Sequence, residues 1–276
     1  MLYLVGTPIG NMGDISERAV EVLSSADLIA CEDTRRTGLL LSNLGIKGNL
    51  TSYHEHNKAS KGNVLIQKLK EGLNVVQVSD AGMPCISDPG SDLVKLCIEE
   101  DIPVTCVPGP VAAITALVLS GLDTRYYHFE GFIPVDNKER KARIEALKKY
   151  NETVVIYEAP HRLLKTIDDL IEAGFSDCEA AFCRELTKKY EQVVRLKISE
   201  AKAYFTEVPP KGEFVICLKP VFEQKEEKEL SEDEIESMAR NLISEGCSTK
   251  QTAARLAELT GRNKKDMYSY VLNLIK

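Results

Sequence analysis

The sequence predicts an α/β fold made of two α/β domains with a small helical appendage at the C-terminal end. Three observations support this prediction: short apolar strands alternate with amphipathic helices, the alternation begins again near residue 120, and three short helical segments close the chain. The predicted parts are 1–120, 121–220 and 221–276, the last comprising a charged linker and a helix-turn-helix-like tail. A chain of 276 residues is long enough for two ordinary domains.

The spacing of apolar residues defines the elements of the first domain. In the helix at 15–26, for example, Ile15, Ala19, Leu23 and Ala26 share one face. Short apolar strands separated by such helices are typical of a largely parallel sheet. Strands are predicted at 2–6, 27–31, 74–78 and 103–107, and helices at 15–26, 34–44, 58–71, 91–100 and 111–119.

The second domain and the tail follow from the same patterns. Strands are predicted at 126–132, 153–159, 178–186, 190–198 and 212–220, and helices at 137–150 and 161–174. The strands at 178–186 and 190–198 are expected to pair with each other. A charged stretch at 221–234 then leads to three short helices, predicted at 232–246, 248–260 and 263–275.

The composition indicates a globular protein of the cytoplasm. The chain is 43% hydrophobic and 28% charged, and its longest apolar runs are too short to span a bilayer. The first residues, MLYLVG, lack the basic and cleavable segments of a signal peptide. None of the eight cysteines forms a CxxC pair, which favours reduced, buried thiols over disulfides or zinc. The histidines of HEH (54–56) have no third ligand in sequence, so no metal site is predicted.

The charge is distributed unevenly along the chain. A formal net charge of −7 argues against a protein that coats nucleic acid. Residues 247–276 nevertheless carry six basic side chains and two acidic ones. The tail could therefore bind a polyanion, although a solvated helix surface also explains the cluster.

Three turns rich in glycine or proline follow predicted strands of the first domain. They are GTPIGNMGD (6–14), SDAGMPCISDPG (79–90) and PGP (108–110). Ligands of open α/β sheets bind at the carboxyl ends of the strands, where small residues let the backbone approach closely. The G-x-G-x-x-G and P-loop patterns are absent, so we expect a ligand without a pyrophosphate.

Charged clusters follow other predicted strands. These are CEDTRR (31–36), YEAPHR (157–162) and CRELTKKYE (183–191). Each alone could be a structural ion-pair network. Collected at strand ends, they are expected to line a shared cleft in which the bases contact phosphate and the acids orient hydroxyl or cationic groups.

Together these motifs resemble a known family. The order GTPIGN, EDTR, SDAGxPxISDPG, VPGPxA, YExPHR, RELTKxYE and GEFV over residues 6–215 is similar to the tetrapyrrole-methylase superfamily, and within it to the bacterial 16S rRNA (cytidine-2′-O)-methyltransferases. Met83 stands where that family usually has threonine, and Cys183 where an acid is common. Met83 has no hydroxyl to donate to a cofactor, but the backbone turn is retained.

The resemblance implies a fold of the class III S-adenosylmethionine methyltransferase type. It also implies that S-adenosylmethionine binds in the cleft between the two α/β domains of the chain, and that the protein is a homodimer. The substrate implied is 16S rRNA of the small ribosomal subunit. Carried over by position, the implied cofactor contacts are Pro8, Ile9, Gly10, Ala81, Gly82, Met83, Ile86, Val111, Ala112, Tyr157, Glu158 and Leu186.

The implied reaction is an in-line attack of a ribose 2′-hydroxyl of a decoding-site cytidine on the sulfonium methyl. Alignment supplies much of the acceleration, and a base is expected to help the hydroxyl proton leave. Asp80 is the first candidate, followed by Asp33 and Glu158. Expected phosphate contacts are Arg35, Arg162, Arg184 and Lys188.

Two other functions are compatible with the sequence. One is a small-molecule, tetrapyrrole-type methyltransferase of the same fold, which the acidic net charge favours and the clustered arginines disfavour. The other is a non-catalytic RNA-binding protein that has kept the fold. The complete set of glycine turns argues against that second alternative.

Overall fold

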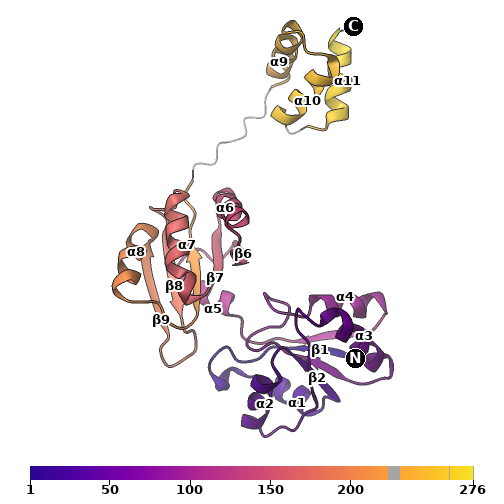
Figure 1. Ribbon diagram of the computed structural model, residues 1–276, viewed down its shortest axis with the longest axis vertical. Helices are drawn as coiled ribbons and strands as arrows, with labels where there is room; N and C mark the ends of the chain where they lie inside the picture. The colour runs from indigo at the N-terminus through magenta and orange to yellow at the C-terminus, as the bar shows by residue number, and fades with distance from the viewer. Residues whose placement is uncertain (223–230, 261, 276) are drawn as a thin grey trace. The chain divides into compact units, whose positions relative to one another are not determined.

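The computed structural model describes residues 1–222, 231–260 and 262–275, and it divides into two compact units, Met1–Phe222 and Glu223–Lys276. The first unit holds two five-stranded sheets with their helices, and the described part of the second is helical (Figure 1). The α/β class and the helical appendage are therefore confirmed. Part of the predicted linker, 223–230, lies outside the described residues, and the predicted domain limits stay predictions.

The first sheet is wholly parallel, with strand order β3-β2-β4-β1-β5. Helices α1 and α2 contribute to the apolar cluster on one face, while α3 and α4 contribute to the cluster on the other. Residues such as Val75 and Val76, adjacent in β4, point into opposite clusters, which explains why this strand is continuously apolar. The elements are β1 Leu2–Val5, α1 Glu17–Ser24, β2 Leu28–Cys31, α2 Thr34–Asn43, β3 Leu50–Ser52, α3 Lys58–Lys70, β4 Val75–Gln77, α4 Ser91–Glu99 and β5 Val104–Val107, with a 3₁₀ turn at Met12–Asp14.

The second sheet is mixed, with strand order β6-β7-β10-β8-β9. Only β6 and β7 run parallel, and the predicted pairing of β8 with β9 is confirmed as antiparallel. The elements are α5 Ala112–Ser120, β6 Tyr127–Phe132, α6 Asn137–Ala146, β7 Thr153–Glu158, α7 Pro160–Glu172, β8 Glu179–Arg184, β9 Gln192–Lys197, α8 Ile198–Glu207 and β10 Phe214–Leu218, with a 3₁₀ turn at Leu147–Lys149.

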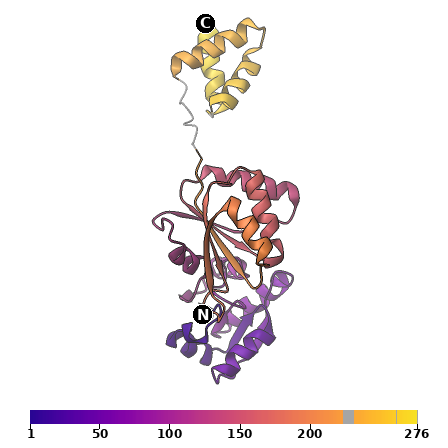
Figure 2. The same cartoon turned by 90° about the vertical axis from the view of Figure 1, so that its left-hand side faces the viewer.

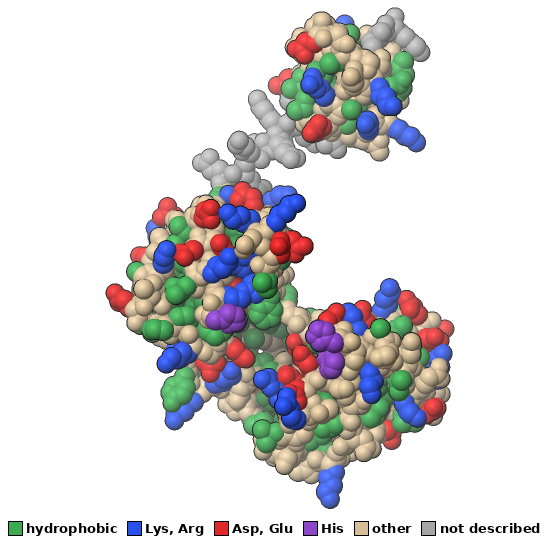
Figure 3. Space-filling model, viewed as in Figure 1, with side chains coloured by type: hydrophobic (Ala, Val, Ile, Leu, Met, Phe, Trp, Pro, Cys, Tyr) green, Lys and Arg blue, Asp and Glu red, His purple; other side chains and the backbone are tan. Residues whose placement is uncertain are grey.

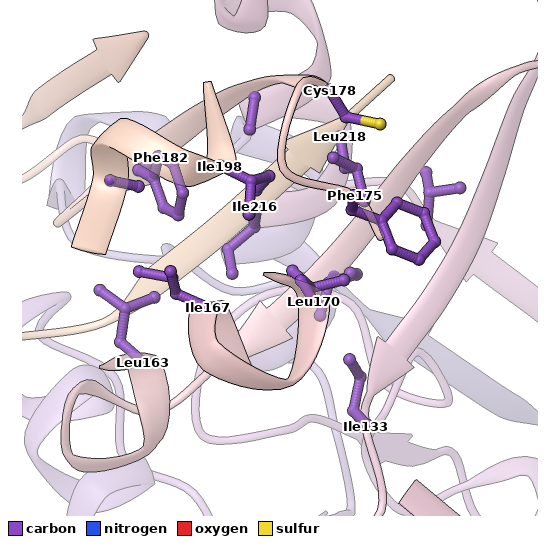
Figure 4. Close-up of a cluster of buried hydrophobic side chains, with 14 of the residues drawn as sticks. Ile133, Leu163, Ile167, Leu170, Phe175, Cys178, Phe182, Ile198, Ile216 and Leu218 are labelled. Carbon is purple, nitrogen blue, oxygen red and sulfur yellow. The ribbon is translucent and has the colours of Figure 1, made fainter. Parts of the chain in front are cut away.

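The core of the second sheet lies mainly on the face covered by α7 and α8, which are seen together on one side of the sheet in Figure 2. Leu163, Ile167 and Leu170 recur at helical spacing along α7 and are fully buried (Figure 4). They meet Ile216 and Leu218 of β10, whose strand is buried along its whole length. Burial of a side chain of this size contributes roughly 1.5–3 kcal/mol.

Helix α5 follows the last strand of the first sheet but packs on the second sheet. Its buried residues Ala113, Ala116 and Leu117 share a cluster with Val155 of β7 and Val215 of β10. This face of the second sheet is opposite the one that carries α7 and α8. The helix therefore belongs by its contacts to the second half of the unit.

The C-terminal unit has a small core of its own. Helices α9 (Glu232–Ser244), α10 (Thr249–Thr260) and α11 (Lys264–Ile275) correspond to the three predicted helices. Their buried hydrophobic residues form a single cluster: Ile235, Ala239, Ala253, Leu256, Met267 and Val271. Ser231 caps α9, with its hydroxyl accepting from the Glu234 N–H. Among the residues that the structure describes, no helix is long and apolar enough to cross a membrane.

Candidate active site between the two sheets

A cavity of about 360 Å³ lies between the loops of the first sheet and one end of the second. Figure 3 shows the hollow between these two halves of Met1–Phe222. A cavity of this size can enclose a small organic ligand. Its lining residues are Ile9, Ala81, Gly82, Met83, Ile86, Ser87, Asp88, Val111 and Ala112 from the first half and its connection to α5, and Phe132, Tyr157, Glu158, Ala159, Pro160, Glu213, Phe214 and Val215 from the second half.

The strand order explains why the three glycine- and proline-rich turns meet. They follow β1, β4 and β5, and these are neighbours in the order β4-β1-β5. Since the strands are parallel, their carboxyl ends lie at one edge of the sheet. The predicted convergence of the turns is therefore what the topology requires.

Two glycines allow the backbones of neighbouring turns to touch. A Cβ on Gly6 would lie 2.6 Å from Gly109 Cα, and a Cβ on Gly109 would lie 2.7 Å from Gly6 Cα. Thr7 and Gly82 also exchange two backbone hydrogen bonds, of 2.9 and 3.0 Å. The first turn is thus fixed on both sides, to the 79–90 loop and to the PGP turn.

The loop at 79–90 holds an unusual backbone conformation. Gly82 and Gly90 have positive φ, and so do the non-glycine residues Cys85 (72°) and Ser87 (61°). L residues rarely adopt this region, and such strain persists only where surrounding contacts enforce it. Here Gln77, buried in β4, donates from Nε2 to the Pro89 carbonyl at 2.8 Å. The loop is therefore a fixed wall of the cavity.

Tyr157 connects the second sheet to α5. Its hydroxyl accepts a hydrogen bond from the Ala113 N–H at 3.1 Å, which satisfies a free donor at the first turn of α5. Phe129 and Phe132 pack edge-to-face on its ring. Burial raises the pKa of Tyr157, so the hydroxyl stays protonated at neutral pH.

We expect Tyr157→Phe to lower the free energy of unfolding by about 1–2 kcal/mol, because it leaves the Ala113 N–H without its partner. Urea unfolding of the intact chain measures this change. Tyr190→Phe is the control: Tyr190 is largely exposed, so its loss should stay within about 0.5 kcal/mol. Equal effects of the two variants would contradict a structural role for the Tyr157 hydroxyl.

Most of the predicted cofactor residues lie around this one cavity. Its lining includes Ile9, Ala81, Gly82, Met83, Ile86, Val111, Ala112, Tyr157 and Glu158. Pro8, Gly10 and Leu186 are not among the lining residues. Gly10 instead lies against the RELTKKYE segment, where an added Cβ would be 3.0 Å from the Leu186 carbonyl oxygen.

The three predicted catalytic carboxylates have different surroundings. Asp80 accepts from the Asp33 N–H at 3.0 Å and lies 3.3 Å from Arg36. Asp33 caps α2 and pairs with Arg35, which holds the pKa of the Asp33 carboxyl well below its usual range. Neither of these two aspartates lines the cavity.

Glu158 does line the cavity, but its side chain is fully buried. The carboxylate accepts from the Ala159 N–H at 2.9 Å and from the Thr166 hydroxyl, and it lies 3.3 Å from Arg162 Nε. These three groups occupy much of its hydrogen-bonding capacity. The geometry is that of an anchor for the turn between β7 and α7.

The four predicted phosphate contacts all have protein partners in this structure. Arg35 is exposed and pairs with Asp33. Arg162 bonds to the Ile133 carbonyl oxygen, and Arg184 donates to the Lys211 carbonyl oxygen at 2.7 Å. Phosphate binding by these side chains would therefore require them to exchange or share these partners.

Lys188 belongs to a connection between the two halves. Its Nζ lies 2.9 Å from Glu185 and 2.8 Å from Glu213, and its side chain packs over Gly10. Beside it, the Asn11 N–H donates to the Thr187 hydroxyl at 3.0 Å. The RELTKKYE segment thus joins the first glycine turn to the second sheet.

Eight lining residues were not among the predicted site residues, and Asp88 and Phe132 are the two of most chemical interest. Asp88 lies within the loop that the sequence singled out, but nothing in the pattern distinguishes it from Asp80. Phe132 ends β6 with 53% of its surface exposed, and its exposed side chain lies on the lining of the cavity. The alternation of β6 could have suggested an outward-facing residue, but not that it faces a cavity.

The fold and the site define a class of protein, and comparison with known proteins agrees with it. Residues 1–202 match the family described as Tetrapyrrole (Corrin/Porphyrin) Methylases. The chain belongs to this family. A uroporphyrin-III C-methyltransferase from Thermus thermophilus, solved in complex with S-adenosylhomocysteine, has the same fold: 17% identity, a TM-score of 0.56, and coverage of 79% of this chain and 96% of that one.

Two relatives with higher sequence identity to this chain share one name. A protein named ribosomal RNA small subunit methyltransferase I from Synechocystis sp. is 43% identical over 99% of this chain and 98% of its own. The protein of the same name from Haemophilus influenzae is 40% identical over 99% of this chain and 96% of its own. The similarity therefore includes the C-terminal helical unit as well as the two sheets.

Proposed function

We propose that this protein transfers a methyl group from S-adenosylmethionine to the ribose 2′-hydroxyl of a decoding-site cytidine in 16S rRNA. The observation that carries the proposal is the convergence of three glycine- and proline-rich turns and the Tyr157–Pro160 segment on one cavity. Near full-length similarity to proteins named for methylation of small-subunit rRNA supports the same reaction.

The lining suits S-adenosylmethionine chemically. Ile9, Ile86 and Val111 offer apolar contacts for an adenine ring, and the fixed glycine turns expose backbone groups for its polar edges. Carboxylates of Asp88 and Glu213 face a ligand that carries positive charge. When bound, this ligand supplies an electrophilic methyl group. The chain's part is to orient the two reactants and keep water away from them.

We propose that the rRNA side of the site is the open side of the cavity. Phe132 and Ile86 are exposed apolar residues on its lining, which suits stacking of an unpaired base. Arg35, Arg162, Arg184 and Lys188 remain the proposed phosphate contacts. Their present partners would be exchanged for, or shared with, phosphate oxygens.

The C-terminal unit is proposed to bind flanking rRNA. Lys250, Arg255, Lys264 and Lys265 are basic residues on or beside its helices α10 and α11. Binding through such residues should weaken steeply with rising salt, because phosphate contacts release counterions. The proposal places the reaction in the cytoplasm, where the small ribosomal subunit is found.

A homodimer is part of the proposal. Helix α5 is apolar around its whole circumference, yet Ile114 and Val118 on its outer side are exposed. A second copy of this chain would cover these side chains. Light scattering of wild type and of Val118→Asp tests this: we expect a dimer that the aspartate dissociates, and a monomeric wild type would contradict it.

The test of function is transfer of tritiated methyl from S-adenosylmethionine to small ribosomal subunits that lack the modification, with the labelled nucleotide then mapped. We expect label on a ribose 2′-oxygen of a decoding-site cytidine. Transfer only to a tetrapyrrole-type small molecule would replace the proposed acceptor. Absence of both transfer and binding of S-adenosylhomocysteine would overturn the enzymatic assignment.

A further inference from the structure

We propose that Asp88, rather than Asp80, Asp33 or Glu158, is the catalytic residue that takes the proton from the acceptor hydroxyl. This inference rests on the proposed function and names the base within it. It starts from position: Asp88 lines the cavity, whereas Asp80 and Asp33 do not. A base must reach the hydroxyl that it deprotonates, so position is the first criterion.

The backbone holds Asp88 in place from both sides. Before it, Ser87 has a positive φ of 61°, and its hydroxyl packs on Gly131 of β6, 3.2 Å from where a Cβ would lie. After it, the Pro89 carbonyl accepts from Gln77 Nε2 at 2.8 Å. Gly131 directly precedes Phe132, so the same contact brings the exposed aromatic ring and the carboxylate to one part of the cavity wall.

The other lining carboxylates are already engaged. Glu158 is fully buried and bound to Ala159, Thr166 and Arg162. Glu213 pairs with Lys188 at 2.8 Å. Asp88 forms no ion pair with any residue that the structure describes, and the nearby Ser79 hydroxyl donates to the Ala81 carbonyl oxygen at 3.2 Å. It therefore keeps lone pairs available for a substrate hydroxyl.

The surroundings make Asp88 a better base than an exposed aspartate. Burial, with additional repulsion from Glu32 and Asp80, raises its pKa to about 6, while the Ser79 hydroxyl acts in the opposite direction. The neighbouring Tyr157 hydroxyl is uncharged at neutral pH, because burial raises its pKa. Asp88 is thus ionised at neutral pH but holds a proton more readily than usual, as a general base requires.

The proposed step conserves atoms and charge. As the bond forms between the ribose oxygen and the methyl carbon, the carbon–sulfur bond breaks and its electron pair stays on sulfur, giving the neutral thioether of S-adenosylhomocysteine. The hydroxyl proton moves to the Asp88 carboxylate. Asp88 then releases that proton to solvent and returns to its ionised form.

The first experiment compares wild type, Asp88→Asn and Asp92→Asn in methyl transfer to small subunits across pH 5 to 8. Asp92 lies nearby in α4, is half exposed and pairs with Lys58, so it is the matched control. We expect Asp88→Asn to lower kcat by about 100-fold or more with KM little changed. Wild type and Asp92→Asn should share a limb at which the rate falls below about pH 6.

Two further measurements do not depend on the rate. Carbon-13 NMR of labelled aspartate should show a carboxyl that titrates near pH 6 in wild type and is missing in Asp88→Asn. Glu32→Gln should move that titration, and the rate limb with it, to lower pH, because it removes a repelling charge. Calorimetry should show that Asp88→Asn still binds S-adenosylhomocysteine.

The outcomes separate the two proposals. If wild type transfers no methyl to rRNA, the proposed function fails. If wild type is active and Asp88→Asn keeps more than a tenth of its kcat with the acid limb unchanged, Asp88 is not the base. An unchanged limb in Glu32→Gln would overturn the assignment even if Asp88→Asn proved unable to fold.

Discussion

Gly109→Ala should abolish binding of S-adenosylhomocysteine and lower the free energy of unfolding by about 3 kcal/mol. The added methyl would lie 2.7 Å from Gly6 Cα, 2.9 Å from Gly6 C and 3.0 Å from Gly6 O. All three are backbone atoms, so no rotation of a side chain relieves the overlap. The turns after β1 and β5 would have to separate, and both supply lining residues of the cavity. Calorimetric titration and urea unfolding measure the two effects.

Gly38→Ala is the matched control for this variant. Gly38 lies inside α2, and its added methyl would meet only Leu50 Cδ1 at 3.7 Å, an ordinary contact. Alanine in a helix interior is favoured over glycine by about 0.5–1 kcal/mol. We therefore expect a slightly more stable protein with unchanged ligand binding. Similar loss of binding in both variants would mean that the close approach of Gly6 and Gly109 does not shape the site.

Arg140→Met should lower the free energy of unfolding by about 3 kcal/mol and also weaken cofactor binding. Arg140 is among the largest fully buried side chains, and its guanidinium bonds Asp169 and, at 2.6 Å, the Thr166 hydroxyl. Removing one partner of a buried ion pair leaves the other charge uncompensated. Thr166 in turn donates to Glu158, which anchors the cavity wall at Glu158–Pro160. Urea unfolding and titration with S-adenosylhomocysteine would test both effects.

Lys141→Met is the matched control for this variant, because it removes a basic side chain that is exposed rather than buried. Lys141 is the next residue in α6, and its ion pair with Glu172 is long, 3.4 Å, and exposed. Exposed pairs contribute about 0–1 kcal/mol, so we expect little change in stability and none in binding. If Lys141→Met lowered the free energy of unfolding as much as Arg140→Met, the burial of the Arg140 network would not be the cause of the effect.

The secondary structure was largely predictable because apolar periodicity and burial agree in most elements. Two elements were missed. Strand β3 has only three residues, none of them buried, so no alternation marks it. Helix α8 begins directly where β9 ends, and the predicted strand wrongly extends to Ile198. Its buried Ile198, Ala201 and Phe205 do recur at helical spacing, which the adjoining strand pattern concealed.

The parts of the site that are formed by backbone turns were predictable from the sequence. The hydrogen-bond and ion-pair partners of its charged side chains were not. Glycine and proline turns after strands identify a ligand wall, because topology brings strand ends together. The sequence does not say which carboxylates will be neutralised. Asp80 and Asp88 look alike in SDAGMPCISDPG, yet one is held by Arg36 and the Asp33 N–H while the other faces the cavity. The positive φ of Cys85 and Ser87, which shapes the loop between these two aspartates, is likewise not revealed by a pattern of residue types.

Because α5 leaves the first sheet and packs on the second, neither half of Met1–Phe222 is self-sufficient. A fragment ending at residue 120 would carry an apolar helix with nothing to cover Ala113, Ala116 and Leu117. We therefore expect the two halves to unfold in one transition rather than in two. The same helix, held at its first turn by Tyr157, limits how far the cavity walls can swing apart. In the proposed reaction, the rRNA would then bring its target nucleotide to a cavity that is already formed.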